Sequence, residues 1–212
     1  MSTRAIKYPE ITFGRVEAVW NKLGGEDGVD RFLRGDLVVS EPTCRFREKD
    51  GVIYLAVTSN GMTGPQWIEH LEGKGFRVSD YAKQPLRSKD FRPTTGMTYE
   101  IAILKGLLFE ENDRVTSKIR AKAESLNLTK PNAEVVCLIR ENFSDEEIKA
   151  MGLTRIIVMH EPIKDADGYP NLFGAYRLDD GRRLYADYDY PDRRWRDDGG
   201  FAFSVPQVGH QV

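Results

Sequence analysis

The chain has 212 residues and a formal net charge of −2, and 40% of its residues are hydrophobic. That length is typical of one domain, or of one domain with a small helical piece, and the apolar content is enough for a real core. The near-neutral charge gives no overall field that would draw the chain to nucleic acid or to an anionic membrane.

The two cysteines, Cys44 and Cys137, lie far apart and match no metal-type spacing. Their use indicates a reducing compartment. The first twenty residues are rich in charge and contain no apolar run of the signal-peptide kind. Nowhere does the sequence approach the roughly 20 apolar residues that a membrane helix needs. We therefore expect a soluble, cytoplasmic protein with no membrane partner.

Two short helices are predicted near the N-terminus, over residues 15–23 and 26–33, with Gly24-Gly25 between them. We expect residues 14–35 to form a helical hairpin that packs as a lid on a single globular domain spanning residues 1–212. A separate recognition module is the weaker hypothesis, because about forty residues rarely fold alone. Packing on a neighbouring chain stays open.

Strands are predicted next at residues 37–39 and 52–58, with Asp50-Gly51 as the turn between them. Thr63 and Gln66 have the spacing of a capping box, which predicts a helix that follows with apolar side chains facing inward. Residues 98–108 alternate with apolar side chains on both faces, so this strand should be central in a sheet.

A helix is predicted from Asn112 or Asp113 to Leu126, and another from Pro131 through an apolar stripe ending at Phe143. Ser144 and Glu147 then form a second capping box. Gly152 provides a left-handed stop. The apolar, β-branched run over residues 153–159 predicts a strand buried on both faces.

The C-terminal part contains strand patterns alone. Residues 172–177 and 182–189 predict a hairpin around Asp179-Asp180-Gly181, and residues 201–205 predict a last strand before a frayed tail at 206–212. Because strands and helices alternate irregularly, the pattern favours an α+β fold over a doubly wound sheet. We predict a mixed β-sheet containing strands 52–58, 98–108 and 154–161, flanked by helices.

The first candidate site follows the buried strand. His160 at its end could act as a general base or metal ligand beside nearby carboxylates, and strand ends do deliver catalytic groups. The candidate catalytic residues are His160, Glu161, Asp165 and Asp167. A half-buried histidine beside a polar turn gives the same pattern, and no second histidine or known ligand spacing lies nearby.

The second candidate is a basic row on the helix that ends at Leu126. Arg114, Lys118 and Lys122 recur at every fourth residue, which would align them along one edge where they could contact phosphates. A following helix from Pro131 would complete a helix-turn-helix, although it carries few side chains that could read bases. Long cations flanking an apolar stripe are the simpler explanation of the row.

The third candidate is the C-terminal segment in which aromatic side chains interleave with arginines. Such mixtures line ligand, peptide and base-stacking surfaces. The candidate binding residues are Tyr185, Tyr188, Tyr190, Arg193, Arg194, Trp195 and Arg196. Neighbouring aspartates nearly cancel the arginines, so an edge hairpin whose interleaved charges prevent association is the alternative.

Familiar catalytic motifs are missing from the sequence. It contains no P-loop, no G-x-G-x-x-G, no G-x-S-x-G, no C-x-x-C and no H-E-x-x-H, and its three histidines are His70, His160 and His210. These absences disfavour nucleotide-dependent, zinc and serine-hydrolase enzymes. We expect no cofactor and no metal.

Several phrases carry a resemblance to a known group. The chain resembles a family of small bacterial proteins of no assigned activity over about residues 15–205, through VEAVWNKLGG, GFRVSDYAKQPLRSKDF, KPNAEVVCLIRENFSDEEIKAMGL, VMHEPIKDADG and RWRDDGGFAF. The resemblance implies a bacterial or phage-associated cytosolic protein. It brings no functional residue with it.

The leading hypothesis is therefore a non-enzymatic binding or interaction protein that uses the aromatic–arginine C-terminal surface. The alternative is a small hydrolase-like enzyme centred on His160. The third hypothesis is a weak nucleic-acid binder through Arg114, Lys118 and Lys122. No partner is identified by the sequence; another protein is the candidate class, and nucleic acid is disfavoured.

Overall fold

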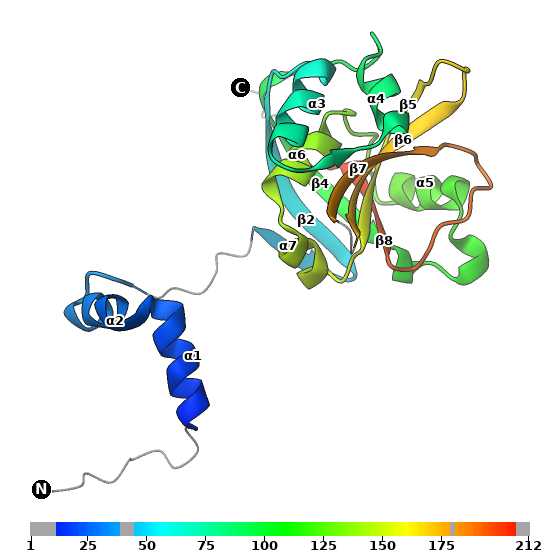
Figure 1. The fold of residues 1–212 in the computed structure, drawn as a ribbon. Helices are drawn as coiled ribbons and strands as arrows, with labels where there is room; N and C mark the ends of the chain where they lie inside the picture. The colour runs from blue at the N-terminus through cyan, green and yellow to red at the C-terminus, as the bar shows by residue number, and fades with distance from the viewer. Residues whose placement is uncertain (1–11, 39–44, 179–180, 207–212) are drawn as a thin grey trace, which may run out of the picture. The chain divides into compact units, whose positions relative to one another are not determined.

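The computed structural model describes residues 12–38, 45–178 and 181–206. The chain divides into two compact units, Met1–Cys44 and Arg45–Val212. Figure 1 shows the elements of both.

The first unit contains two helices, α1 (Phe13–Leu23) and α2 (Gly25–Arg34). Gly24 joins them with a φ of 96°, a left-handed conformation that suits glycine. The two helices contact each other, which confirms the predicted hairpin. None of the described residues of α1 is buried, and in α2 only Gly28 is. The packing of this helical hairpin as a lid on the rest of the chain stays a prediction.

The second unit is built on one mixed sheet. Within the described residues this sheet has eight strands in the order β1-β2-β4-β8-β5-β6-β7-β3. Neighbouring strands are antiparallel except for the pairs β5–β8 and β3–β7. The strands are β1 Phe46–Lys49, β2 Val52–Asn60, β3 Arg77–Val78, β4 Thr95–Lys105, β5 Arg155–Lys164, β6 Pro170–Leu178, β7 Gly181–Tyr188 and β8 Gly199–Ser204.

Helices cover both faces of the sheet (Figure 1). They are α3 Gly64–Gly73, α4 Asp80–Leu86, α5 Thr116–Ser125, α6 Val135–Asn142 and α7 Asp145–Ala150, with 3-10 turns at Gly106–Leu108 and Glu111–Asp113. One core cluster joins α3, α4, α6 and α7 to the sheet, and a second joins α5 to the opposite face. This arrangement confirms the predicted α+β fold with strands 52–58, 98–108 and 154–161 in one mixed sheet.

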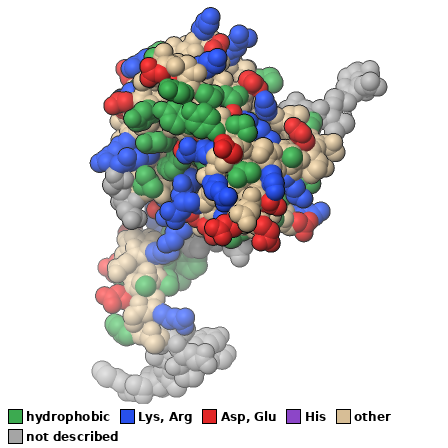
Figure 2. Space-filling view, turned by 90° about the vertical axis from the view of Figure 1, so that its right-hand side faces the viewer, with side chains coloured by type: hydrophobic (Ala, Val, Ile, Leu, Met, Phe, Trp, Pro, Cys, Tyr) green, Lys and Arg blue, Asp and Glu red, His purple; other side chains and the backbone are tan. Residues whose placement is uncertain are grey.

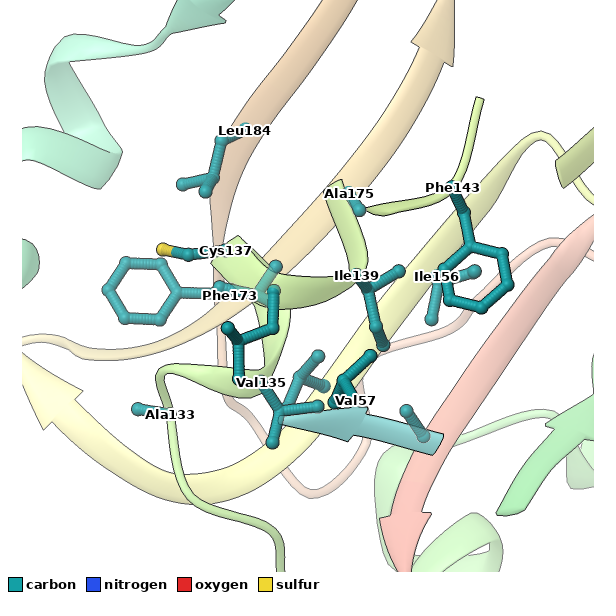
Figure 3. Close-up of a cluster of buried hydrophobic side chains, with 14 of the residues drawn as sticks. Val57, Ala133, Val135, Cys137, Ile139, Phe143, Ile156, Phe173, Ala175 and Leu184 are labelled. Atoms are coloured by element: carbon teal, nitrogen blue, oxygen red, sulfur yellow. The ribbon is translucent and has the colours of Figure 1, made fainter. Parts of the chain in front are cut away.

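Helix α6 lies at the centre of the larger core cluster. Six consecutive residues, from Val135 to Arg140, are buried. Figure 3 shows its side chains, including Cys137 and Ile139, among strand residues such as Phe173 and Ile156. A helix that is buried on every side has its position set by packing rather than by helix propensity.

Local signals in the sequence are confirmed where they depend on near neighbours. Both predicted capping boxes are present, at Thr63–Gln66 and Ser144–Glu147. Gly152 follows α7 with a φ of 77°. The predicted C-terminal hairpin is the antiparallel pair β6–β7. The predicted frayed tail lies outside the described residues except for Pro206.

The strand predicted at residues 37–39 is wrong for 37 and 38, which form no strand, while residue 39 lies outside the described residues. Instead, β1 directly precedes the Asp50-Gly51 turn. Asp50 and Gly51 have φ of 53° and 75°, and the turn pairs Lys49 with Val52. A two-residue hairpin turn with positive φ at both positions requires the partner strand to begin at once.

Two predicted helix starts are too early. Helix α5 begins at Thr116, because a 3-10 turn occupies Glu111–Asp113 and Val115 bridges to Arg194. Helix α6 begins at Val135, after a turn in which the Asn132 side chain accepts a hydrogen bond from the Glu134 N–H. The predicted strand 98–108 runs instead from Thr95 to Lys105.

Candidate functional site

His160, the centre of the first candidate site, is 1% exposed on β5. Its Nδ1 lies 2.7 Å from the Glu161 carbonyl, and its Nε2 accepts a 3.0 Å hydrogen bond from the Phe173 N–H. Burial lowers the pKa of His160 to about 4, so the ring is neutral at physiological pH. Since the backbone occupies both nitrogens, the geometry assigns His160 a structural role that joins β5 to β6.

The acidic residues of that candidate do not converge on His160. Glu161 is exposed and its carboxylate pairs with Lys130. Asp165 accepts hydrogen bonds from the Asp167 and Tyr169 N–H groups, at 3.1 and 2.9 Å. Asp165 therefore shapes the turn between β5 and β6, and Asp167 is an exposed residue of the same turn. Among the described residues, no group of three or more His, Cys, Asp or Glu could hold a metal ion.

The basic row of the second candidate is not a uniform cationic edge. Arg114 precedes α5, and its guanidinium donates to the Gly106 and Phe109 carbonyls at 3.0 and 3.1 Å. Lys118 pairs with Asp113. Lys122 lies on the same helix and helps to line a shallow hollow with Lys118. One of the three predicted phosphate-binding cations thus stabilises a turn, and another is already paired.

Trp195, from the third candidate, is 7% exposed and lies under the surface. Its indole N–H donates a 2.9 Å hydrogen bond to the Thr116 hydroxyl at the start of α5. The Arg193 guanidinium covers its ring at 4.6 Å. Trp195 therefore anchors the segment after β7 to α5 and presents no ring face to a partner.

The arginines that flank Trp195 have their own contacts. Arg194 donates to the Asn112 side chain at 3.3 Å, and Arg196 pairs with Asp198 at 3.3 Å. Both are exposed. Arg194 and Arg196 stay candidate binding residues. Because Trp195 is buried, the accessible aromatic surface of this segment comes mainly from its tyrosines.

Five tyrosines gather beside the β6–β7 hairpin, and we call them the tyrosine cluster: Tyr81, Tyr169, Tyr185, Tyr188 and Tyr190. They come from α4, from the turn between β5 and β6, from β7 and from the segment that follows β7. Ring centroids lie 5.6 Å apart for Tyr169 and Tyr188, 5.8 Å for Tyr188 and Tyr190, and 6.4 Å for Tyr81 and Tyr185. Tyr185, Tyr188 and Tyr190 were predicted from the C-terminal segment, and the structure adds Tyr81 and Tyr169 to them.

The cluster borders a hollow of about 280 Å³. The lining includes Tyr81, Asn171, Tyr185, Asp187, Tyr188 and Arg193. The view in Figure 2 faces the right-hand side of Figure 1 and shows hydrophobic side chains, a class in which the figure includes tyrosine, gathered on the large unit with basic and acidic side chains around them. Tyr81, Tyr169 and Tyr190 are 57%, 48% and 40% exposed. Their rings are therefore accessible from solvent.

The floor of the hollow is a polar group centred on Asp187, in which the buried Arg193 Nε has no hydrogen-bond partner among the described residues. Asp187 accepts from the Tyr176 hydroxyl at 2.5 Å and from Arg193 at 2.5 Å. Burial, followed by the charge of Asp187, raises the pKa of Tyr176 far above its usual value, so this hydroxyl stays a donor. The Asn171 amide donates to Asp165 and to the Tyr169 carbonyl at 3.1 and 2.8 Å, which holds the turn that carries Tyr169.

The hydroxyl groups of the tyrosine cluster are different. In the part of the chain that the structure describes, none of the five donates to or accepts from another protein group. Partial burial, followed by the Asp165 carboxylate, raises the pKa of Tyr188. The Tyr188 hydroxyl therefore stays protonated. Each hydroxyl of the cluster is a group that can donate a hydrogen bond to a ligand.

Sequence reasoning found Tyr185, Tyr188 and Tyr190 but missed Tyr81, Tyr169 and Asn171. Ser79 caps α4 through the Ala82 N–H and so orients the first turn that carries Tyr81. No local pattern connects that turn with β7, because the contact depends on how α4 packs against the sheet. A Tyr-Pro pair at 169–170 beside an Asp-Gly turn was the one available signal.

No protein-family model matches this chain, and comparisons with curated proteins and with solved structures also find no match. The resemblance to a family of small bacterial proteins therefore stays a prediction. No helix among the described residues is long and apolar enough to cross a membrane.

Proposed function

We propose that this protein is a binding protein and that it holds its ligand on the tyrosine cluster. The observation that carries the proposal is the arrangement of the cluster: Tyr81, Tyr185 and Tyr188 line one hollow, and Tyr169 and Tyr190 contact Tyr188 beside it. The five hydroxyls have no protein partner among the described residues. Tyrosine offers a large apolar face and a polar tip at little conformational cost, which is why binding surfaces are rich in it.

The support beneath the cluster favours a preformed site. Tyr185 and Tyr188 lie on β7, which is hydrogen-bonded along its length to β6. The pair between Asp187 and Arg193, and the bond from Tyr176 to Asp187, fix the floor. A site on rigid elements loses less entropy when a ligand binds.

The proposal is tested by nuclear magnetic resonance on the full chain, with the tyrosine rings isotopically labelled. Three probes are added separately: a proline-rich decapeptide, thymidine monophosphate and maltose. Support is a saturable shift of the Tyr81 and Tyr188 ring signals in the unsubstituted protein, together with loss of the Tyr81 shift in Tyr188→Ala. Tyr54→Ala is the matched control, because Tyr54 lies on β2 and packs with Arg47 at 4.4 Å.

The proposal fails if none of the probes shifts these signals. It also fails if the probe still binds to Tyr188→Ala with unchanged affinity. Circular dichroism of both variants verifies that the sheet is intact, so that a lost signal reports binding.

A further inference from the structure

Resting on the proposed function, we infer that the ligand of the tyrosine cluster is a proline-rich protein segment in the polyproline II conformation. The inference comes from three properties of the cluster: the tilt of its rings, the prior engagement of its polar floor and the hydroxyls at its rim.

The ring geometry disfavours a nucleobase. A base held between two aromatic rings needs parallel faces about 7 Å apart, which is two stacking contacts. Tyr169 and Tyr188 are inclined by 63°, Tyr81 and Tyr185 by 41°, and each pair is already in contact. Tilted rings in mutual contact form ridges with shallow grooves between them rather than a slot for a flat ring.

The polar floor disfavours a sugar. Recognition of several hydroxyl groups requires side chains whose donors and acceptors are available to the ligand. Here each carboxylate oxygen of Asp187 already has a partner, and the Asn171 amide donates to Asp165 and to a backbone carbonyl. What the hollow offers a ligand is ring surface and hydrogen-bond donors: the tyrosine hydroxyls and the Arg193 Nε, which has no partner among the described residues.

A polyproline II segment is complementary to these ring surfaces and hydrogen-bond donors. Proline has no N–H, so such a segment presents carbonyl acceptors and apolar ring faces and needs few acceptors in return. The tyrosine hydroxyls can donate to those carbonyls while the proline rings fill the grooves between the tilted rings. Because the segment is extended before it binds, little conformational entropy is lost.

The charges around the tyrosine cluster predict one further feature of the ligand's sequence. Arg193 is paired with Asp187, and Arg120 with Asp189 at 2.8 Å. Asp165 and Asp167, in the turn beside Tyr169, have no cationic partner within the described residues. A basic residue that flanks the prolines would therefore meet an acidic rim.

The test measures fluorescence anisotropy of a labelled peptide of ten prolines with one flanking arginine, titrated with the full chain. A glycine–serine peptide of the same length and charge is the matched control. We expect saturable binding of the proline peptide and none of the control. Tyr188→Ala should weaken binding roughly tenfold or more, and Tyr54→Ala should leave it unchanged. Tyr188→Phe should lose less than Tyr188→Ala, because it keeps the ring and removes one donor.

Two results would overturn the inference in different ways. If oligothymidylate or a maltose oligomer binds in place of the proline peptide and Tyr188→Ala abolishes that binding, the ligand class is wrong and the proposed function stands. If no probe binds, or if binding ignores every substitution in the cluster, both are wrong. Equal binding of the glycine–serine peptide would likewise exclude recognition of the polyproline conformation.

Discussion

Helix α6 in the large unit has six consecutive buried residues, whereas none of the described residues of α1 in the first unit is buried. Both helices contain a comparable density of apolar side chains. Phe13 at the start of α1 is 88% exposed, and Leu33 in α2 is 74% exposed, while Phe173 beside α6 is 1% exposed. An apolar pattern therefore predicts a helix but not the burial that stabilises it.

The exposed side chains of the first unit share one groove. It is lined by Arg15, Val16, Val19, Trp20, Leu23, Val29, Phe32 and Leu33. Helix formation alone is marginal for segments of this length, since most helical stability in proteins comes from packing. The same type of substitution should therefore lower the free energy of unfolding strongly in the large unit and only slightly in the first unit.

The largest expected effect is that of Phe173→Ala. Its ring contacts those of Phe91 and His160, and its removal should lower the free energy of unfolding by about 4 kcal/mol through lost burial and a cavity. The matched substitution Phe13→Ala should change it by less than about 0.5 kcal/mol. Urea unfolding followed by circular dichroism measures both. Equal losses would show that Phe13 is covered in solution.

Arg140→Leu should lower the free energy of unfolding by about 3 kcal/mol. The Arg140 guanidinium is fully buried and donates to the Tyr176 carbonyl, the Phe143 carbonyl and the Asp145 carboxylate, at 3.1, 2.9 and 2.8 Å. The leucine would remove all three hydrogen bonds and leave the Asp145 carboxylate without its buried cation. Arg34→Leu in α2 is the control, because its pair with Asp36 is exposed and contributes little. A loss below 1 kcal/mol at Arg140 would mean that water replaces the missing donors.

His160 should make the large unit sensitive to mild acid. Its pKa is lowered from 6.5 to about 4, so between these values the unfolded chain binds a proton that the folded protein does not. Its contribution to stability is therefore complete above pH 6.5 and decreases as the pH falls, by about 3 kcal/mol near pH 4. Urea unfolding at a series of pH values should show a shallower dependence for His160→Gln. Parallel curves would refute a neutral, buried ring.

The smallest expected effect is that of Leu33→Asp. In the first unit this side chain is largely exposed, so the free energy of unfolding of the sheet should change by less than about 0.5 kcal/mol. The sequence, however, predicts that the hairpin is a lid on the rest of the chain. A loss of more than about 1 kcal/mol in the sheet transition would support the lid, because a buried carboxylate is costly. Lys22→Asp, at an exposed site of the same unit, controls for added charge.

The elements of the fold that were predicted correctly depend on residues close together in the chain. The capping boxes at Ser144 and Thr63, the glycine stop at Gly152 and the hairpin β6–β7 each involve side chains within a few positions of their backbone partners. At the start of α5 the prediction was wrong because a distant contact intervened. Val115 bridges to Arg194, and the chain before α5 therefore follows the C-terminal segment instead of continuing the helix.

The candidate site divides in the same way. An aromatic segment could be recognised from Tyr185, Tyr188 and Tyr190 alone. That Trp195 lies inside, bonded to Thr116, follows from packing against α5, which no spacing of residues encodes. The same holds for His160, whose second nitrogen is occupied by the Phe173 N–H on the neighbouring strand.

Turns, caps and periodicity act over a few residues, so the sequence was enough to predict the α+β class and most of the strands and helices, but not β1 or the starts of α5 and α6. Which side chains stay accessible depends on tertiary packing. The tyrosine cluster exists because α4, the β5–β6 turn and β7 meet at one edge of the sheet. Burial and the pairing of polar groups depend on such contacts between distant segments. They make His160 a structural residue and bring the separate tyrosines together on one surface.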